Sequence, residues 1–533
     1  MQPATLRFAV LHDDGRLADW QARCVQELLA LGGIKPQILI VRESCTDMPG
    51  ILAGATQILL PAPVAPAVEH PAMHATVARI RHHTPDFALD FLSDPCPAEL
   101  IDVPRYGTWR FHFGEWTRYR GKAPGFWEVY DGEFISGALL ARELQRHDAV
   151  IVLRDGYFRT DLYSPTRNRA MLEGRVARWA AQVCVDIRNG VTDRFGAPPV
   201  AGAAKLRMPP TWMQRMRCST RTAMRVLRLA WQSLFRHDQW NVGLVEQPIA
   251  AFLRHERRAP VRWLPATKRN ELRADPFGVM RDGHLSILCE YMSYDDMRGY
   301  IIAIESMSAS RAVRVAIGPV NPVHMSYPFL LHADQRVLCI PETSEAHEVA
   351  LYESEHFPDR WAKIATLVAG AAIIDATLFQ HEEYWWLAGS ELAHRGANCE
   401  LHLWYAPSIT GPWIPHPANP VKVDIRSARP GGTPFVVDGT LYRPAQDCSQ
   451  TYGGRITINR VLTLNPLAFR EEAFAFVDPD AEGPYPDGLH TLSQVGNVTL
   501  IDGKRVLFVP AEFRRVLLKK LASVFKRSRT PTH

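Results

Sequence analysis

The 533-residue sequence predicts an α/β domain followed by an all-β five-bladed propeller. Two observations predict this order. Strand-like and helix-like segments alternate over residues 1–200, which is typical of a parallel sheet with crossover helices. Between Asp282 and Gly503, a tight polar turn followed by aromatic or β-branched residues then recurs five times, roughly every 50 to 60 residues. That spacing is too long for one rung of a solenoid and suits a blade of four strands.

The first elements of the α/β domain follow from the apolar pattern near the N-terminus. A strand is predicted over residues 6–11, a helix over 19–31 and a second strand over 36–41. The alternation continues to about residue 200, where it stops. We therefore expect a Rossmann-like domain over residues 1–200.

The chain after this domain is strongly basic. From Arg194 to His237 there are nine lysines and arginines and neither aspartate nor glutamate. Apolar residues such as Leu227 and Trp231 interleave with the arginines at helical spacing, which predicts a basic amphipathic helical linker over residues 201–238. The propeller is then expected over residues 239–510.

A smaller basic amphipathic segment is predicted as the C-terminal tail, over residues 511–533. The linker and the tail both have the composition of helices that lie on an anionic membrane surface. The alternative is a helix packed against the propeller, with a solvated tail. Nucleic acid is not expected as a partner, because no recognised binding module accompanies the charge.

Targeting and redox features predict a cytoplasmic protein, with the inner membrane face as the place of any peripheral attachment. The N-terminus lacks the ordered regions of a signal peptide, and no apolar stretch reaches the roughly 18 residues of a membrane span. The nine cysteines are scattered without zinc spacing, which predicts reduced and mostly buried thiols.

The hairpin phrases place one polar residue on the innermost strand of each predicted blade. The phrases are Asp282-Gly283, Ala333-Asp334-Gln335, His381-Glu382-Glu383, Asp438-Gly439 and Asp502-Gly503. Asp-Gly between apolar runs favours a type I′ turn, which needs positive φ at both central positions. Just upstream of the turns stand Asp275, Tyr327, Asp375, Arg429 and His490. Because the inner strands of a propeller converge, we expect these five residues to ring the mouth of the central channel.

The α/β domain contains the segment Tyr106-Gly-Thr-Trp-Arg-Phe-His-Phe-Gly-Glu-Trp-Thr-Arg-Tyr-Arg-Gly-Lys-Ala-Pro-Gly. Its Tyr-Arg-Gly-x-x-Pro resembles the core of formyltransferases. The resemblance implies that His112 is the catalytic histidine, and it puts Arg110 where those enzymes keep an oxyanion-stabilising asparagine. Asp148 is the nearest downstream candidate for the family's aspartate. Two interpretations follow: a sugar formyltransferase, or a degenerate domain that binds an anionic or nucleotide-linked ligand through Arg110, His112 and Arg120.

The propeller phrases Ala-Asp275-Pro-Phe, Ile-Asp375-Ala-Thr and Gly-Leu-His490 resemble five-bladed glycoside hydrolases of the arabinanase and xylosidase type. The resemblance implies that Asp275 is the base and that Asp375 tunes the acid. It also makes a calcium ion near His490, at the propeller centre, compatible with the sequence. No other metal-ligand set is predicted.

The acid of that family is a glutamate, and this sequence has Arg429-Pro at its place. An arginine cannot act as a general acid near neutral pH. Two interpretations stay open: Glu342, Glu345 or Asp447 has taken the acid role, or the site no longer hydrolyses.

Two further phrases, Ser-Ala-Arg429-Pro-Gly-Gly and Tyr442-Arg-Pro-Ala-Gln-Asp447, resemble the domain N-terminal to the transferase domain of plant glucosamine inositolphosphorylceramide transferases. No counterpart of that transferase domain is expected here. Arginine suits a bidentate clamp on a phosphate or carboxylate. The candidate substrate-binding residues of the propeller are therefore Tyr327, Arg429, Arg443, Gln446 and His490.

Together these features predict a carbohydrate-active protein of cell-surface polysaccharide assembly. The preferred chemistry is glycosyl or substituent transfer onto an anionic or phosphate-linked sugar at the propeller mouth. A nucleotide sugar or sugar phosphate would be the donor, and a glycan or lipid-linked sugar the partner. The alternatives are a glycoside hydrolase, a sugar formyltransferase and a non-catalytic glycan-binding scaffold.

Overall fold

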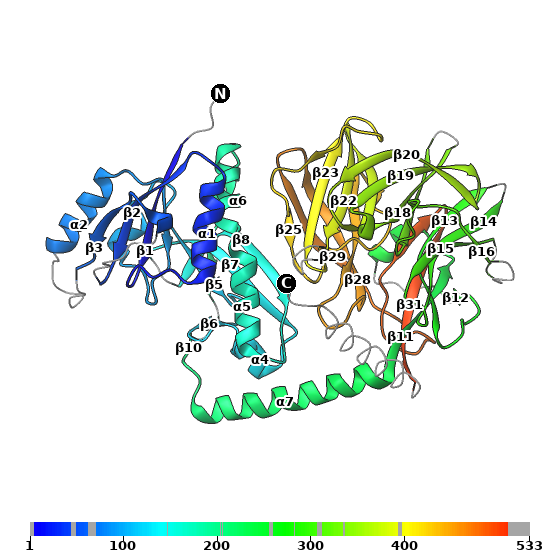
Figure 1. Ribbon diagram of the computed structural model, residues 1–533, viewed down its shortest axis with the longest axis horizontal. Coiled ribbons are helices and arrows are strands. Elements are labelled where there is room, and N and C mark those ends of the chain that lie inside the picture. Colours follow the sequence, from blue (N-terminus) through cyan, green and yellow to red (C-terminus); the bar gives the residue numbers. More distant parts are fainter. Residues whose placement is uncertain are drawn as a thin grey trace, which may run out of the picture. The chain divides into compact units, whose positions relative to one another are not determined.

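The computed structural model describes residues 5–43, 50–61, 71–145, 148–202, 204, 206–254, 259–281, 283–305, 307, 312–333, 336–392 and 397–509. The chain forms two compact units, Met1–Thr222 and Ala223–His533, which we describe separately (Figure 1). The predicted tail over 511–533 lies outside the described residues. So do Asp282 and the pair Asp334-Gln335, which belong to two of the hairpin phrases.

The first unit is built on one mixed sheet. Its strands are β1 (Leu6–His12), β2 (Ile34–Val41), β3 (Thr56–Leu59), β4 (Phe87–Asp90), β5 (Thr108–Phe113), β7 (Ile135–Glu143), β8 (Ala149–Arg159) and β9 (Val200–Ala201). The spatial order is β3-β2-β1-β4-β5-β7-β8-β9. The first five strands pair in parallel and the rest are antiparallel. The predicted Rossmann-like alternation of β1, helix and β2 is therefore confirmed.

Helices cover this sheet. They are α1 (Asp19–Ala30), α2 (Pro71–His82), α3 (Ala98–Ile101), α4 (Trp127–Asp131), α5 (Pro165–Val176) and α6 (Trp179–Arg188), with 3-10 turns η1 (Gly50–Leu52) and η2 (Asp193–Gly196). Ser164 begins α5 by accepting a hydrogen bond from the Arg167 N–H at 3.2 Å, and Pro165 follows at the first helical position. Side chains of α2, including Val77 and Ile80, pack on the sheet to form one core. Strands β6 (Arg120–Gly121) and β10 (Leu206–Arg207) pair with each other to form a separate two-stranded sheet.

A long helix, α7 (Trp212–Phe235), begins in the first unit and ends in the second (Figure 1). Its early turns bury Cys218 in a cluster with Phe126 and Trp127 of the first unit. Its last turn stacks Trp231 on Phe508 of the second unit, with ring centroids 6.0 Å apart. The predicted linker thus contains a 24-residue helix.

The second unit is a propeller of five sheets. Blade I holds β13 (Glu271–Arg281), β14 (His284–Ser293), β15 (Gly299–Ile304) and β16 (Ala312–Arg314); blade II holds β17 (Ser326–Ala333), β18 (Arg336–Glu342), β19 (Glu348–His356) and β20 (Arg360–Ala369). Blade III holds β21 (Ile373–His381), β22 (Tyr384–Glu391), β23 (Glu400–Ala406) and β24 (Ile414–Pro415), with β25 (Lys422–Val423) on β23; blade IV holds β26 (Phe435–Val437), β27 (Thr440–Asp447), β28 (Arg455–Leu464) and β29 (Phe469–Val477). The five-bladed architecture is confirmed.

Blade V joins the two ends of the unit. It combines β30 (Leu492–Val495) and β31 (Val498–Phe508) with β11 (Arg236–Val245) and β12 (Val261–Trp263). Strand β11 pairs with β31 along its whole length, from Arg236 opposite Phe508 to Val245 opposite Thr499. Short 3-10 turns, η3 (Ile249–Leu253) and η4 (Ser344–Ala346), complete the described elements. The ring is therefore closed by strands that are far apart in the sequence.

One of the five predicted turns is wrong. Asp438-Gly439 forms the expected turn, with φ of 49° and 75°. Asp502-Gly503 instead lies inside β31, with the Asp502 side chain fully buried, and the chain turns earlier, at Gly496-Asn497. The Asp502 carboxylate accepts hydrogen bonds from the N–H groups of His490 and Thr491, so its partners are in the core and not in a turn.

Two sequence-based expectations concern the whole chain. No helix among the described residues is long and apolar enough to cross a membrane. The eight cysteines that lie within the described residues are all unpaired and buried, as expected for reduced thiols.

Candidate functional site

The innermost strands of blades I, II and III share one irregularity. Each has a shift of register at the same place, between Ala274 and Phe277, between Ser326 and Phe329, and between Ile374 and Thr377. Asp275, Tyr327 and Asp375 stand in these bulges with positive φ, at 52°, 41° and 52°. A positive φ is costly for these residue types and persists only where the surroundings hold it. The bulges therefore turn three of the predicted mouth residues toward one shared volume.

The neighbouring strands supply a second set of polar residues. The residue before each bulge pairs with Glu290 on β14, Glu342 on β18 and Ser390 on β22. Glu290 is therefore the blade I counterpart of Glu342 on blade II. Glu290 was not among the sequence-predicted residues. Aligning the second strands of the blades by their distance from the turn would have found it.

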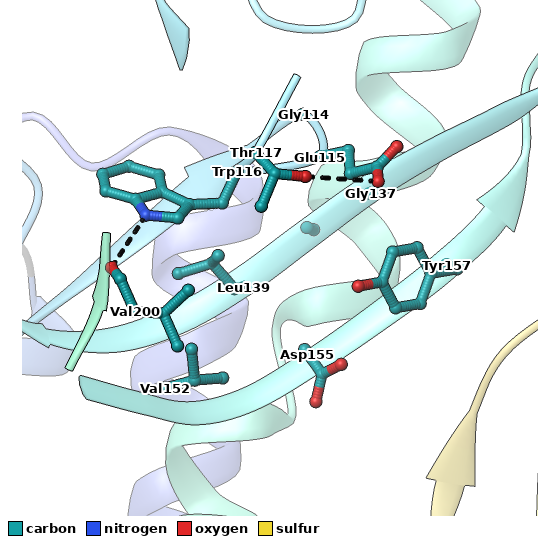
Figure 2. A pocket seen from close by; sticks show the side chains of 11 residues that line it. Gly114, Glu115, Trp116, Thr117, Gly137, Leu139, Val152, Asp155, Tyr157 and Val200 are labelled. Atoms are coloured by element: carbon teal, nitrogen blue, oxygen red, sulfur yellow. Dashed lines mark hydrogen bonds between the residues drawn. The ribbon is translucent and has the colours of Figure 1, made fainter. Parts of the chain in front are cut away.

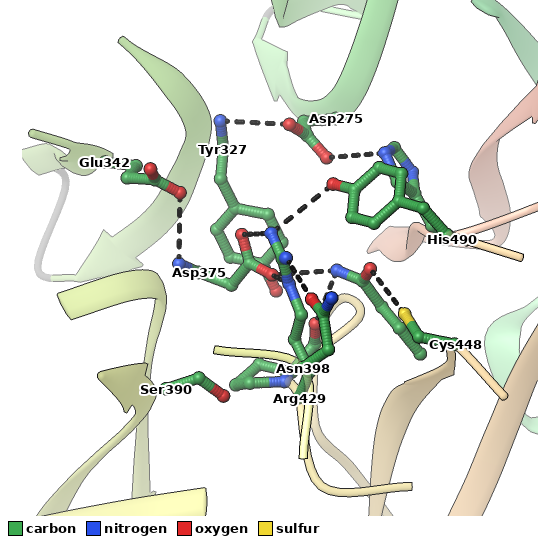
Figure 3. A network of polar contacts seen from close by, with 12 residues as sticks. Asp275, Tyr327, Glu342, Asp375, Ser390, Asn398, Arg429, Cys448 and His490 are labelled. Carbon is green, nitrogen blue, oxygen red and sulfur yellow. Dashed lines mark hydrogen bonds and ion pairs between the residues drawn. The ribbon is translucent and has the colours of Figure 1, made fainter. Parts of the chain in front are cut away.

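The buried polar residues at the propeller centre form what we call the carboxyl cluster: Asp275, Glu290, Glu342, Asp375, Arg429, Gln446, His490 and Asp502. Within it, Asp375 and Arg429 form a buried ion pair (Figure 3). Arg429 donates through Nε to Asp375 Oδ2 and through Nη2 to Oδ1 at 3.2 Å, and through Nη1 to Asn398 Oδ1 at 2.7 Å. Gln446 donates to Asp375 Oδ2 at 2.7 Å. Burial opposes the charge on Arg429, but Asp375 raises the pKa of the guanidinium well above its ordinary value. Arg429 is thus a charged group that is already neutralised by a protein carboxylate.

His490 joins two carboxylates in the same cluster. Its Nδ1 lies 2.6 Å from Asp502 Oδ2, and its Nε2 lies 3.7 Å from Asp275 Oδ1. The ring stacks on Trp240 with centroids 3.9 Å apart. Burial opposes protonation, but Asp502 and then Asp275 raise the pKa of His490 above its ordinary value. Burial likewise opposes charge on Asp502, whose pKa His490 holds below its ordinary value. The imidazolium form is therefore stabilised.

A calcium ion, with which the sequence is compatible, would have to bind at Asp275, His490 and Asp502. Ligand atoms of Asp275, His490 and Asp502 lie within 4.8 Å of one another. Yet both Asp502 oxygens face N–H donors: Oδ1 accepts from His490 and Thr491, and Oδ2 from Asp275 N–H at 3.1 Å as well as bonding His490 Nδ1. Calcium takes six to eight oxygen ligands, whereas this carboxylate is saturated by protein hydrogen bonds.

The remaining carboxyl groups differ in protonation. Burial raises the pKa of Asp275 to about 6, against the lowering effect of His490. Burial and then the charge of Asp375 raise the pKa of Glu342 to about 8. Burial also raises the pKa of Glu290 well above its ordinary value. Asp275 therefore ionises more readily than Glu342, and a pair of carboxyl groups with separated pKa values is what acid–base chemistry on one substrate requires.

Tyr327 braces the strands beneath these carboxyl groups. Its hydroxyl lies 2.9 Å from Thr377 Oγ1 and accepts the Gly432 N–H at 2.8 Å. The side chain is buried and packs edge-on against Phe277. Tyr327 thus connects blades II, III and IV, and it acts as a support for the cluster in place of the predicted substrate contact.

Two predicted propeller residues are not in the cluster. Arg443 donates through Nε and Nη2 to Glu471, at 2.9 and 2.6 Å, and its other hydrogen bonds go to the carbonyls of Ser427 and Ala428. Its guanidinium is therefore committed to blade IV and is not an anion clamp at the mouth. Asp447 accepts hydrogen bonds from Ser449 and from Arg455, so its carboxylate connects residues within blade IV. Of the acids proposed from the sequence, Glu342 is therefore the candidate general acid.

In the first unit, His112 has a partner that sequence reasoning missed. Its Nε2 lies 2.6 Å from Glu143 Oε1, on the neighbouring antiparallel strand. Asp148, the nearest downstream candidate for the family's aspartate, is exposed. Arg110 is bound to Asp90 at 2.8 Å and to the carbonyls of Leu92 and Asp94. Arg110 therefore serves its own unit and is not available as the substitute for an oxyanion-binding asparagine.

A cavity of about 250 Å³ lies in the same unit (Figure 2). Trp116 brings His112 close to this cavity, because it lines the cavity and its ring centroid is 4.6 Å from that of His112. The guanidinium of Arg120 lies over the same indole at 4.2 Å and donates to the Gly202 carbonyl at 3.0 Å. The cavity lining also includes Glu115, Thr117, Asp155 and Tyr157. His112 and Arg120 thus share one neighbourhood, whereas Arg110 is tied elsewhere.

Fold and site together define the class: a Rossmann-like α/β unit joined to a five-bladed propeller whose centre is rich in buried carboxyl groups. Residues 264–482 match the protein family described as "Glucosamine inositolphosphorylceramide transferase 1, N-terminal". The resemblance of the propeller to that domain is therefore confirmed.

Curated relatives carry the same name. The Arabidopsis thaliana glucosamine inositolphosphorylceramide transferase 1 is 34% identical over 208 residues, which covers 38% of this chain and 27% of that protein. The protein of Oryza sativa subsp. japonica is 32% identical over 203 residues, covering 37% of this chain and 27% of that protein. The matched region thus spans about a quarter of the length of these relatives.

Similar solved structures include proteins of two kinds. Glycinamide ribonucleotide transformylase 1 from Symbiobacterium toebii is 12% identical, with a TM-score of 0.29, and the match covers 35% of this chain and 89% of that one. A family 117 glycoside hydrolase from Zobellia galactanivorans is 13% identical, with a TM-score of 0.33, and the match covers 51% of this chain and 91% of that one.

Proposed function

We propose that the propeller binds a sugar at the carboxyl cluster and transfers a glycosyl group or another substituent to or from it. The observation that carries this proposal is the convergence of buried carboxyl groups from neighbouring blades, in which Tyr327 N–H donates to Asp275 Oδ2 and Asp375 N–H donates to Glu342 Oε2, both at 3.3 Å. Burial raises the pKa of Glu342 further than that of Asp275, to about 8 against about 6. The match to the N-terminal region of a transferase that is named for a glycolipid substrate supports a glycosyl transfer role in glycolipid synthesis.

The two carboxyl groups have complementary roles in the proposed reaction. Ionised Asp275 accepts the proton of the attacking hydroxyl, and protonated Glu342 donates its proton to the departing oxygen. Asp375 and Arg429 stay paired, and Asp375 helps to keep the Glu342 proton in place because its charge raises the pKa of that carboxyl group. His490, held between Asp275 and Asp502, lowers the pKa of Asp275 and so favours the ionised base.

The charge balance of the cluster bears on the substrate. An anionic group needs a cation that is free to bind it, but Arg429 is paired with Asp375 and Arg443 with Glu471. Arg429 and Glu342 keep 9% and 8% of their surface exposed, against 2% for Asp375. We therefore propose that a sugar hydroxyl meets Glu342 and Arg429 first, and that any phosphate or lipid of the substrate lies outside the cluster.

Hydrolysis is the second candidate, because the same acid and base serve equally when water is the acceptor. The two reactions differ in their products. The full chain is incubated with nucleotide sugars, sugar phosphates or neutral oligosaccharides, with and without a sugar acceptor, and the products are analysed by mass spectrometry. A product that needs the acceptor supports transfer, and release of free sugar without it supports hydrolysis.

Variants identify the site that performs the reaction. We expect Asp275→Asn and Glu342→Gln to lose turnover while binding of the sugar persists, because each keeps its shape and loses one proton-transfer role. Glu353→Gln is the matched control, since Glu353 lies on β19 of the same blade as Glu342 and pairs with Arg336 at 3.8 Å, apart from the cluster. Full turnover in Glu342→Gln would refute the assigned acid.

A thermal-shift experiment tests whether the chemistry lies in the first unit instead. Ligand binding to the native state raises the melting temperature. Stabilisation by a reduced folate that is lost in His112→Ala and kept in Asp275→Asn would move the chemistry to the α/β unit and contradict the propeller proposal.

A further inference from the structure

Helix α7 exposes an unusually apolar surface. One side of it, which we call the apolar face, consists of Trp212, Met213, Met216, Met224 and Leu227. Trp212, Met216 and Leu227 are 73%, 62% and 70% exposed. At 3.6 residues per turn these five positions span about 120° of the helix circumference. Exposed apolar side chains of this size gathered on one side of a helix mark an interaction surface and not ordinary surface scatter.

The other sides of the helix account for its attachment to the protein. Cys218 and Thr222 are buried, and Arg221 donates to the Tyr130 carbonyl at 2.7 Å and lies over the Tyr130 ring. These residues project away from the apolar face, since residues four apart share a side of the helix. The helix is thus fixed by one side while the apolar face is presented outward.

Charge identifies the kind of partner. The helix contains no aspartate or glutamate. Arg217 and Arg228 are exposed and follow directly on the edge of the apolar face, about 20–40° beyond Met224 around the helix. A strip of methionine, leucine and tryptophan bordered by arginine complements a bilayer with anionic headgroups, because the apolar side chains enter the acyl boundary while the guanidinium groups meet phosphates.

We infer that α7 docks the protein on an anionic membrane surface through its apolar face. The helix lies in the plane of the interface and does not cross it, in agreement with the lack of a spanning helix among the described residues. The docking surface is separate from the carboxyl cluster, so the inference stands whether or not the propeller is an enzyme.

Sedimentation with vesicles tests the inference on the full chain. We expect the protein to sediment with vesicles of phosphatidylcholine and phosphatidylglycerol and to stay in solution with phosphatidylcholine alone. Arg217→Gln and Arg228→Gln should each weaken binding about fivefold, the usual contribution of one arginine near an anionic surface. Added salt should weaken binding of the wild type as well.

A matched pair of variants separates docking from folding. Leu227→Ser changes the centre of the apolar face, whereas Leu229→Ser makes the same change at a 44% exposed position about 160° away. We expect Leu227→Ser to weaken vesicle binding at least tenfold and Leu229→Ser to leave it unchanged, with the same melting temperature in both.

Three results would overturn the inference: no sedimentation with anionic vesicles, equal loss in both leucine variants, or equal binding to neutral and anionic vesicles. Sedimentation velocity without lipid tests the alternative that the apolar face binds a second copy of the chain. If the wild type self-associates and Leu227→Ser alone is monomeric, the apolar face is an interface between copies of the chain and not a membrane surface.

Discussion

The Arg429→Met variant tests how much the central ion pair contributes to the propeller. Methionine keeps much of the side-chain volume and removes the charge. Asp375 then stays buried with Gln446 as its remaining charge-stabilising side chain, while Asn398 loses the donor at 2.7 Å. Removing one partner of a buried ion pair costs about 3–5 kcal/mol, because the other charge is left uncompensated.

That loss is large enough to measure. About 3–5 kcal/mol lowers the ratio of folded to unfolded protein by a factor of about a hundred to several thousand. The assay is equilibrium unfolding in urea, followed separately for the two compact units because they need not unfold together. We expect the propeller transition to move to lower urea concentration while the transition of the α/β unit stays in place.

Two controls make the result specific. Arg460 pairs with Glu472 on the surface of blade IV, where both side chains are more than 40% exposed, so Arg460→Met should cost about 1 kcal/mol or less. The double variant Asp375→Leu/Arg429→Met removes both charges and should be less destabilised than the sum of the single variants. If Arg429→Met costs no more than Arg460→Met, or if the single effects simply add, the buried pair does not have the role given to it here.

Three further predictions concern protonation and hydrogen bonding. The rate of the proposed transfer should follow a bell-shaped pH profile with limbs near pH 6 for Asp275 and near pH 8 for Glu342, and Glu342→Gln should abolish the basic limb. Because the pKa of Glu342 is about 8 in the folded chain against an ordinary 4.5, its stabilising contribution is complete below about pH 4.5 and is lost as the pH rises to about 8. Urea unfolding across this range should show a smaller decline in Glu342→Gln. Asp502→Asn should destabilise the propeller by about 3 kcal/mol, since the amide NH₂ would face N–H donors, whereas Asp478→Asn on the surface should change stability by less than about 0.5 kcal/mol.

The sequence repeat predicted much of the propeller site, because equivalent positions in a closed ring must converge. Asp275, Asp375, Arg429 and His490 were found in this way, and all four meet in one cluster. The repeat could not reveal their pairing. That Arg429 serves Asp375 depends on side-chain directions set by the bulge at Asp375, which no local pattern encodes.

The missed residues have physical explanations as well. Asp502-Gly503 has the same local chemistry as a type I′ turn, and only the tertiary partners of the Asp502 carboxylate keep it within a strand. Glu143 reaches His112 across an antiparallel pair, whose register depends on the whole sheet. Residues whose role depends on partners distant in sequence were therefore the ones that sequence reasoning misplaced.

The carboxyl cluster can be completed only after the last strand of the propeller, β31, has been synthesised and has closed blade V. Trp240 on β11, the first propeller strand to be synthesised, stacks on His490, which precedes the last two strands. Until β31 has paired with β11, the imidazole lacks that stacking partner as well as Asp502, which β31 itself carries. A chain that ends before β31 lacks Asp502 and so cannot form the charged histidine between two carboxylates. The proposed acid–base centre therefore forms only when the ring of blades is closed.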